Sequence, residues 1–208
     1  MRVAVLVSGG GTNLQALLDA KKAGALQEAE FVCVVSNRKK AYALERAKAN
    51  GIEAVYLPTV RYEDREEYHR ALRDLLLERR IDLVVLAGYL VVLGKPVIEA
   101  FRNRILNIHP SLIPSFCGPG CYGIKVHEMA LARGVKVTGA TVHFVDDGTD
   151  TGPIIFQKAI EVLPEDTPES LQRRVMEQAE WKLLPRAVDL FTKGLLKAEN
   201  GRAVIEEA

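Results

Sequence analysis

Short apolar runs alternate with helix-like segments through the first half of the chain. The predicted strands lie at 2–8, 29–37, 52–58 and 81–89, and the predicted helices between them at 12–24, 41–51 and 62–80. The last of these strands is almost continuously apolar, which is typical of a strand covered on both faces. Strands that alternate with helices form βαβ units, so this half predicts a parallel twisted sheet with right-handed crossovers.

The second half of the chain has a different pattern. A short helix at 96–101, a strand at 104–109 and a helix at 125–134 precede two strands at 135–145 and 153–162. These two strands alternate apolar and polar residues, so this end of the sheet is expected to be mixed. A last helix is expected from about 167 to 191, and Asn200-Gly201 is a hairpin signal. The pattern predicts a single α/β domain over residues 1–208, with about seven strands and helices on both faces.

The composition is that of an ordinary globular protein. Hydrophobic residues make up 48% and charged residues 26% of the 208 positions. The net charge of +1 gives no bulk electrostatic case for nucleic acid or an anionic membrane, although a small anionic substrate needs only local charge. The apolar run Val3–Val7 is too short for a signal peptide, and no stretch approaches the ~20 apolar residues of a membrane span. A cytoplasmic protein is therefore expected.

The three cysteines, an odd number, do not indicate a disulfide framework. Cys33 lies in an apolar run and is expected in the core, whereas Cys117 and Cys121 flank Gly-Pro-Gly in a loop. A C-x3-C pair without a second pair of ligands is a weak zinc signal, so no metal is expected.

Three consecutive glycines, Gly9 to Gly11, join the first strand to the first helix and are followed by Thr12 and Asn13. Glycines bring backbone N–H groups close to a ligand, and the helix adds its unpaired N-terminal donors and positive dipole end. The lysine of a Walker loop is missing, and no acidic residue ends the second strand to hold a ribose diol. The loop therefore favours a terminal phosphate monoester over a dinucleotide, and the alternative is a tight turn without a ligand.

Two polar side chains end the predicted strand at 104–109. Alternation with period two points Asn107 and His109 to one face and Ile108 to the other. Because the carboxyl ends of parallel strands meet at one edge of a sheet, this pair and the glycine loop are expected at the same edge. A histidine at a strand end is more often structural than catalytic, so the case for chemistry depends on a nearby carboxylate.

The loop after the next strand is a source of carboxylates, because it contains Asp146, Asp147 and Asp150. A carboxylate beside His109 is expected to raise the pKa of the imidazole and make it an acid near neutral pH. Asn107 and protonated His109 would then stabilise an oxyanion on a tetrahedral carbon, as acyl-type transfer requires.

The other histidines have different expected roles. His143, which alternates with Thr141 in the next strand, is expected to orient the acidic loop. His127 begins the sequence H-E-M-A-L rather than H-E-x-x-H, so a metalloprotease site is excluded. His69 lies in a heavily charged predicted helix and is expected to be solvated.

Four stretches together resemble one known family: VLVSGGGTNLQAL, VVLAGYLVVL, LNIHPSLIPSF and VTGATVHFVDDGTDTGPII. They span residue 3 to about 190 and are similar to the phosphoribosylglycinamide formyltransferases. The Asn-x-His-Pro-Ser element is shared among folate-dependent formyltransferases, and the glycine loop with Thr-Asn is specific to this group. The resemblance implies a Rossmann-like formyltransferase fold. Its phosphate-binding half would lie at about 1–104, its catalytic and folate-binding half at about 105–195, and a hairpin tail at about 196–208.

The resemblance also implies a reaction. The amino group of N1-(5-phospho-D-ribosyl)glycinamide would attack the formyl carbon of 10-formyltetrahydrofolate, the co-substrate, in de novo purine biosynthesis. Asn107 and His109 would stabilise the oxyanion, with His109 as proton donor, and Asp150 would keep His109 protonated. The implied partners are these two small molecules, without nucleic acid or membrane, and the implied state is a monomer or homodimer.

Binding residues follow from the same resemblance. For the ribonucleotide they are Gly11, Thr12, Asn13, Glu177 and Glu180. For the folate they are Arg65, Leu90, Val91, Val92, Leu93, Asn107, Asp146, Asp147, Gly148, Thr149 and Asp150. Thr141 and His143 would support the catalytic residues, and no metal is implied.

The chain departs from the family pattern in three places. Val91 stands where many relatives carry arginine, and the loop at 114–124 is longer than usual. The spacing from Val175 to Pro185 is one residue longer than the pattern predicts.

Two alternatives remain open from the sequence. Another formyl-handling enzyme, such as a 10-formyltetrahydrofolate hydrolase or a transfer-RNA or sugar-amine formyltransferase, would share Asn107, His109 and Asp150 but would not need the glycine loop. A non-catalytic module that binds a nucleotide-like phosphate would need the loop but not Asn107 or Asp150.

Overall fold

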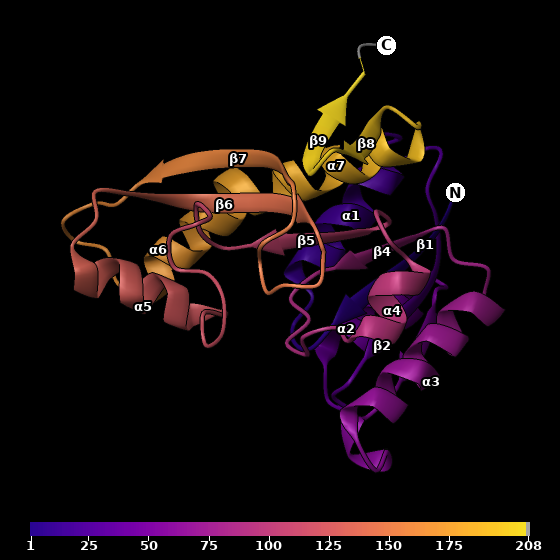
Figure 1. Cartoon of the computed structure of the whole chain (residues 1–208). Helices are drawn as coiled ribbons and strands as arrows, with labels where there is room; N and C mark the ends of the chain where they lie inside the picture. Colours follow the sequence, from indigo (N-terminus) through magenta and orange to yellow (C-terminus); the bar gives the residue numbers. More distant parts are fainter. Residues whose placement is uncertain (207–208) are drawn as a thin grey trace.

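The apolar runs pair into a seven-stranded sheet in the order β3-β2-β1-β4-β5-β6-β7 (Figure 1). The computed structural model describes residues 1–206. The strands are β1 (Arg2–Val7), β2 (Glu30–Ser36), β3 (Glu53–Tyr56), β4 (Leu83–Leu86), β5 (Ile105–His109), β6 (Val137–Phe144) and β7 (Ile154–Glu161). Strands β1 to β5 pair in parallel, whereas β6 runs antiparallel to both β5 and β7. The prediction of a mostly parallel α/β sheet that is mixed near its C-terminal end is confirmed.

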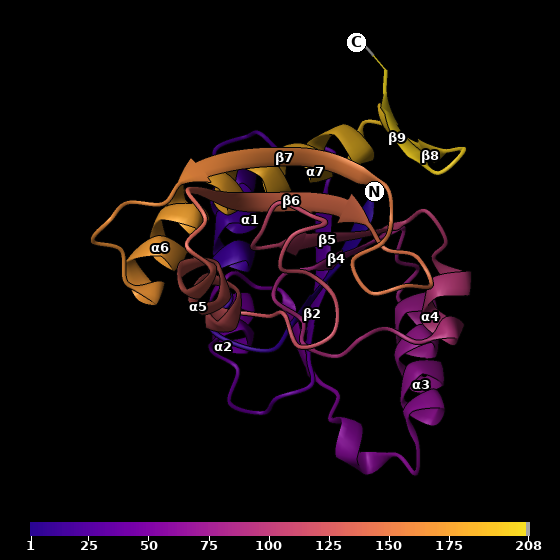
Figure 2. The same cartoon turned by 60° about the vertical axis from the view of Figure 1, so that its left-hand side comes forward.

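Helices cover both faces of the sheet (Figures 1 and 2). They are α1 (Thr12–Lys22), α2 (Tyr42–Ala49), α3 (Arg65–Glu78), α4 (Lys95–Ala100), α5 (Ile124–Arg133), α6 (Pro168–Val175) and α7 (Trp181–Thr192). Alternation along β1 divides the core, because Val3, Val5 and Val7 pack with α1, α2, α6 and α7, while Ala4 and Leu6 pack with α3 and α4. Within residues 1–206, no helix combines the length and the apolar character that crossing a membrane requires.

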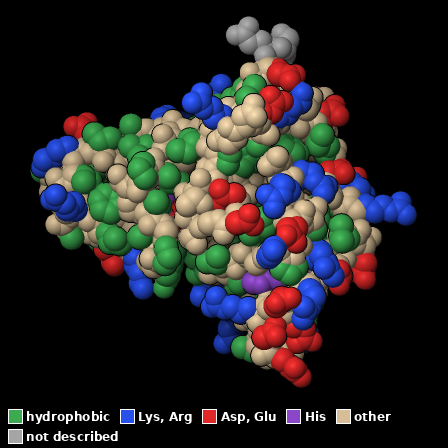
Figure 3. Space-filling model, viewed as in Figure 1, with side chains coloured by type: hydrophobic (Ala, Val, Ile, Leu, Met, Phe, Trp, Pro, Cys, Tyr) green, Lys and Arg blue, Asp and Glu red, His purple; other side chains and the backbone are tan. Residues whose placement is uncertain are grey.

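Charged side chains of both signs mix over the side of the molecule that carries α3 and α4 (Figure 3). Helix α3 begins after Asp64, whose carboxylate accepts a hydrogen bond from the Glu67 N–H and so caps the helix. A 3₁₀ turn, η1 (Thr59–Arg61), precedes it.

The prediction that His69 is solvated is wrong. His69 is only 3% exposed because it lies on the buried stripe of α3, one turn before Leu72. A Cβ atom added to Gly94 would lie 2.5 Å from His69 Nδ1, so the missing side chain of Gly94 makes the space for the imidazole. The prediction was based on the high overall charge of this segment, which does not indicate that one face of α3 is buried.

The last long helix is interrupted by a π-helical turn, η2 (Met176–Glu180), between α6 and α7. A π-turn accommodates one more residue than an α-helical turn, which accounts for the long spacing from Val175 to Pro185. Thr167 caps α6 in a reciprocal arrangement with Ser170.

The hairpin expected at Asn200-Gly201 consists of β8 (Leu196–Glu199) and β9 (Arg202–Ile205). Both turn residues have positive φ, 49° and 74°, which the twist of a two-residue hairpin turn requires.

Candidate active site

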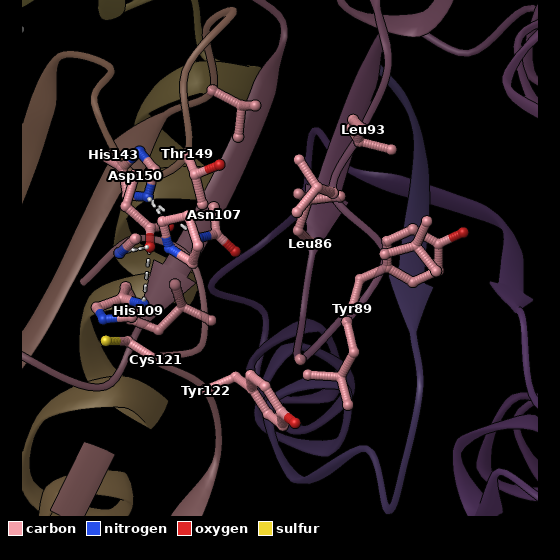
Figure 4. A pocket seen from close by; sticks show the side chains of 18 of the residues that line it. Leu86, Tyr89, Leu93, Asn107, His109, Cys121, Tyr122, His143, Thr149 and Asp150 are labelled. Carbon is pink, nitrogen blue, oxygen red and sulfur yellow. Dashed lines mark hydrogen bonds and ion pairs between the residues drawn. The ribbon is translucent and has the colours of Figure 1, made fainter. Parts of the chain in front are cut away.

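The antiparallel register of β5 and β6 brings four polar side chains together on one face of the sheet. Asn107 lies opposite His143, and His109 lies opposite Thr141. Because alternate residues of a strand share a face, both pairs point in the same direction. Figure 4 shows Asn107, His109 and His143 gathered with Asp150 on one side of the cavity.

His143 orients the amide of Asn107. His143 Nδ1 lies 2.7 Å from the carbonyl oxygen of Phe144, so Nδ1 carries the proton and donates it. In the neutral ring, Nε2 then accepts a hydrogen bond from Asn107 Nδ2 at 3.0 Å. His143 Nε2 also lies 3.7 Å from Asp150 Oδ1, a longer contact that only the imidazolium form would strengthen. One N–H of the Asn107 amide therefore remains for a ligand.

His109 is held between the carbonyl group of a loop and a carboxylate. Its Nε2–H donates to the carbonyl oxygen of Phe116 at 2.9 Å, and its Nδ1 lies 3.6 Å from Asp150 Oδ2. The His109 side chain is 6% exposed and that of Asp150 is 12% exposed, so the pair lies in a region of low dielectric.

The expectation that the pKa of His109 is raised is wrong. Burial lowers the pKa of the imidazole, and it outweighs the Phe116 carbonyl and the charge of Asp150, both of which raise it. For Asp150, burial raises the pKa of the carboxyl. The contact with His143, the hydrogen bond from the Gly118 N–H and the neighbouring His109 together outweigh burial and leave the pKa lowered. At neutral pH the site therefore holds a neutral His109 beside an ionised Asp150.

The loop from β6 to β7 folds back to deliver Asp150. Since β6 is antiparallel to β5, it ends beside the amino end of β5, with Phe144 opposite Leu106. Asp150 reaches the other end of β5 from a left-handed backbone conformation with a φ of 59°, which non-glycine residues rarely adopt. The Gly118 N–H donates to Asp150 Oδ2 at 2.9 Å, so the loop after β5 holds the carboxylate from the opposite side.

Thr141 supports the turn that follows His109. Its hydroxyl donates to the Ser111 carbonyl oxygen at 2.6 Å and accepts from the Ile113 N–H at 3.1 Å. Thr141 is fully buried, as is Ser111. These contacts fix the turn behind the strand end, and Thr141 itself does not face the cavity.

A cavity of about 180 Å³ opens in front of Asn107 and His109. This is several times the ~30 Å³ that one water occupies in the liquid, so the cavity admits part of an organic ligand. The predicted folate residues that line it are Leu90, Val91, Val92, Leu93, Asn107, Asp146, Gly148, Thr149 and Asp150. Val91 is one of the wall residues, so the position where relatives carry arginine presents an apolar surface to the cavity.

Two of the predicted folate residues lie outside this cavity. Asp147 is exposed and pairs with Arg102 at 3.8 Å. Arg65 lines a neighbouring depression that shares Val92 and Leu93 with the cavity wall.

Sequence reasoning missed the aromatic residues of the cavity. Tyr89 closes one wall, and Tyr122 extends from the long loop after β5 together with Cys121 (Figure 4). Tyr122 is 45% exposed. An aromatic residue in a glycine-rich loop was the available signal, because such a side chain has little to pack against except a ligand or a neighbouring loop.

The glycine loop forms a second part of the site at the start of α1. Gly11 precedes the helix with a φ of 72°, and the first N–H groups of a helix have no acceptor within it. Asn13 Nδ2 donates to Glu180 Oε2 at 2.6 Å, which joins α1 to the π-helical turn. The hydroxyl of Thr12 contacts Met176 Sδ at 3.6 Å, whereas Glu177 in the same turn is exposed.

Glu180 is 6% exposed, and its burial raises the pKa of the carboxyl to about 7, although the Asn13 hydrogen bond acts in the opposite direction. A group with this pKa changes its charge near neutral pH.

The two parts of the site adjoin at Ser8. Its hydroxyl accepts a hydrogen bond from the Leu90 N–H at 2.9 Å and donates one to Asn37 Oδ1 at 2.7 Å.

Across residues 1–206, no group of three or more His, Cys, Asp or Glu side chains has an arrangement that could hold a metal ion. Cys33 is buried, and Cys117 and Cys121 are partly buried free thiols.

Comparison with known proteins identifies relatives over nearly the whole chain. A sequence profile of the formyl transferase family matches residues 1–188. Glycinamide ribonucleotide transformylase 1 from Symbiobacterium toebii is 44% identical, with a TM-score of 0.93 over 100% of this chain and 94% of that one. The chloroplastic phosphoribosylglycinamide formyltransferase of Arabidopsis thaliana is 38% identical over 99% of this chain and 70% of its own length. The trifunctional purine biosynthetic protein adenosine-3 of Drosophila melanogaster is 42% identical over 93% of this chain, which spans 14% of the fly protein.

The geometry of the pair predicts how His109 titrates. Replacing Asp150 with Asn removes the carboxylate that raises the pKa of His109, so that pKa should fall further below its usual value of about 6.5. NMR titration of the imidazole resonances measures this change. Asp147→Asn, in the same loop but exposed, should leave the pKa of His109 unchanged. An unchanged or higher pKa in Asp150→Asn would show that the two side chains do not interact.

Proposed function

The chain belongs to the formyl transferase family, and on this premise we propose that it transfers a formyl group from 10-formyltetrahydrofolate to the amino group of N1-(5-phospho-D-ribosyl)glycinamide. The products are the N-formyl compound and tetrahydrofolate, and the reaction is a step of de novo purine biosynthesis. The observation that supports the proposal is that a cavity holding Asn107, His109 and Asp150 adjoins, at Ser8, the glycine loop that precedes α1.

The ribonucleotide would bind at the start of α1. Its phosphate would accept hydrogen bonds from the backbone N–H groups of Gly11, Thr12 and Asn13, where the positive end of the helix dipole stabilises an anion. Glu180, already bonded to Asn13, would accept hydrogen bonds from the ribose hydroxyls. Glu177 is exposed, so any contact that it makes with the substrate is at the rim.

The folate would occupy the cavity in front of β5. Leu90 to Leu93 and the backbone of the acidic loop supply an apolar wall and hydrogen-bonding groups for a bicyclic ring. Arg65 lies along the depression that continues from Val92 and Leu93, where it would attract the carboxylates of the glutamate tail. The co-substrate needs no metal for this chemistry.

Formyl transfer would proceed through a tetrahedral intermediate. The lone pair of the substrate amine forms a bond to the formyl carbon, and the carbonyl electron pair moves onto the oxygen. The free N–H of the Asn107 amide, fixed by His143, would donate to this oxyanion. The bond from the formyl carbon to N10 of the folate then breaks, and N10 takes up the proton that the amine has lost.

Asp150 and His109 would carry this proton between the two nitrogens. The ionised Asp150 attracts the proton of the attacking amine. His109 is neutral before the reaction, and the charge of the oxyanion would raise the pKa of its imidazole during the reaction. When the intermediate forms, His109 Nδ1 would therefore take up the amine proton through Asp150 Oδ2, which lies 3.6 Å away, and then donate it to N10. Because the pKa of the resting His109 is lowered, His109 becomes charged only during the reaction. Its proposed role as proton donor stays the same.

A coupled assay with both substrates tests the proposed function. Formylated ribonucleotide and tetrahydrofolate should appear in equal amounts, and neither should form when the amine is omitted. Release of tetrahydrofolate without the amine would instead identify a hydrolase. Binding of the ribonucleotide without turnover would identify a non-catalytic module.

Asp150→Asn should lower kcat by about 10²- to 10⁴-fold, because the variant keeps the shape of the side chain but cannot accept the proton. The KM for the ribonucleotide should change little, since its phosphate and ribose contacts lie at α1 and η2. Steady-state kinetics measures both constants. The control Asp82→Asn removes an equal charge at the amino end of β4, on the opposite edge of the sheet. Turnover of Asp150→Asn at the normal rate would exclude the assigned role.

Glu180 predicts a pH dependence for ribonucleotide binding. Because the ionised carboxylate accepts stronger hydrogen bonds from the ribose hydroxyls than the protonated carboxyl does, the KM for the ribonucleotide should fall as pH rises through about 7. Glu180→Gln should have a higher KM without this dependence. The phosphate and the amine of the substrate titrate in the same way in assays of both proteins. The ratio of the KM of Glu180→Gln to the KM of the wild type therefore reports the titration of Glu180 alone. A ratio that stays constant from pH 6 to 8 would contradict the prediction.

A further inference from the structure

The carbonyl groups of the glycine loop are held by the neighbouring helix α2. The Ala43 N–H donates to the Gly9 carbonyl oxygen at 3.2 Å. The Arg46 Nε–H donates to the Gly10 carbonyl oxygen at 2.9 Å. Both donors belong to α2 (Tyr42–Ala49), so one short helix contacts two successive peptide groups of the loop.

These contacts determine where the loop N–H groups point. In a trans peptide, the carbonyl of one residue and the N–H of the next are coplanar and point in opposite directions. A Gly10 carbonyl that faces Arg46 therefore turns the Gly11 N–H away from α2. In the same way, the contact of Gly9 with Ala43 turns the Gly10 N–H away from α2. The first N–H groups of α1, which have no acceptor within the helix, follow directly after these two peptide groups.

Arg46 is itself held in place from three directions. Its Nη1 donates to Gln15 Oε1 at 2.7 Å, which ties the guanidinium to α1. Its guanidinium carbon lies 4.9 Å from the centre of the Tyr42 ring, within the range of a cation–π interaction. The planar fork of arginine allows it to bridge the Gly10 carbonyl and Gln15 at once, which a lysine ammonium on its single flexible stem does less well.

Gly11 packs closely against α2. A Cβ atom on Gly11 would lie 2.6 Å from Ala43 Cβ, and Gly11 has a φ of 72°, so only glycine fits. The loop is therefore in contact with α2 at Gly11, and Arg46 completes that contact at Gly10.

We infer that Arg46 is a positioning residue for the phosphate of the ribonucleotide, acting through the Gly10–Gly11 peptide rather than by contact with the reacting atoms. The inference rests on the proposed function for the identity of the substrate. The role assigned to Arg46 is to keep the Gly11 N–H directed toward the anion and to tie α1 to α2 through Gln15.

Two substitutions test this role. Arg46→Met keeps most of the apolar stem and removes every donor, and Arg46→Lys keeps the charge but not the fork. We expect Arg46→Met to raise the KM for the ribonucleotide by about tenfold or more, with kcat within about twofold, since a hydrogen bond from a charged donor to the loop is lost. Arg46→Lys should fall between Arg46→Met and the wild type. The KM for the folate should not change.

A substrate lacking the phosphate separates positioning from a general loss of structure. The preference for the phosphorylated substrate over its 5′-dephospho analogue, measured as a ratio of kcat/KM values, should fall in Arg46→Met. The control Lys48→Ala removes a positive charge from the same helix, where Lys48 is exposed and pairs with Glu45 at 2.9 Å. Its ratio should equal that of the wild type. A ratio unchanged in Arg46→Met, or an Arg46→Lys protein equal to the wild type, would overturn the inference.

Calorimetric titration with ribose 5-phosphate gives the same comparison without turnover. The wild type should bind this probe, and Arg46→Met should bind it at least about tenfold more weakly. If the wild type binds the probe but lacks transferase activity, the proposed function fails while the role of Arg46 is still measured. If transferase activity is present and both proteins bind the probe equally, only the inference about Arg46 fails.

Discussion

The antiparallel register between β5 and β6 decides which side chains meet in the site. It places Asn107 opposite His143 and His109 opposite Thr141, all on one face. A slip of one residue would turn every side chain of one strand to the other face, and the hydrogen bond from Asn107 to His143 would be lost. The other features of the candidate site are arranged around this face. The acidic loop folds back over it, the loop after β5 closes it, and the wall from Leu90 to Leu93 stands opposite.

Burial sets the electrostatic balance of the site. In water, a carboxylate near a histidine would raise the pKa of the imidazole, but here the loss of solvent around His109 has the larger effect and lowers that pKa. Asp150 keeps its charge although it is buried, because the Gly118 N–H donates to its carboxylate and the two histidines lie beside it. The result is a pair in which Asp150 is ionised and His109 is neutral and able to take up a proton. Such a pair can respond to negative charge that develops during a reaction and is absent before it.

The half of the site formed by the glycine loop depends on contacts between helices rather than on the sheet. The π-helical turn presents Glu180 to Asn13, and α2 holds the carbonyl side of the glycine loop. A π-turn inside an α-helix is rare and is often found at functional sites, because the extra residue redirects a side chain at the cost of regular hydrogen bonding. Ser8 joins this half to the cavity through the hydrogen bond that its hydroxyl accepts from the Leu90 N–H.

The sequence by itself determined the succession of strands and helices along the chain, the mixed character of the sheet and the position of the glycine loop. These follow from local periodicity, from turn residues such as Asn200-Gly201 and from the rule that parallel strands end at one edge. The chemistry-bearing residues Asn107, His109 and Asp150 were also visible, partly through family resemblance. Only the tertiary structure decided the burial of His69, the π-turn, the approach of Asp150 across the face of β5 and the direction of the His109 pKa shift. Each of these depends on which atoms surround a side chain from distant segments of the chain, and periodicity along one segment contains no record of those neighbours.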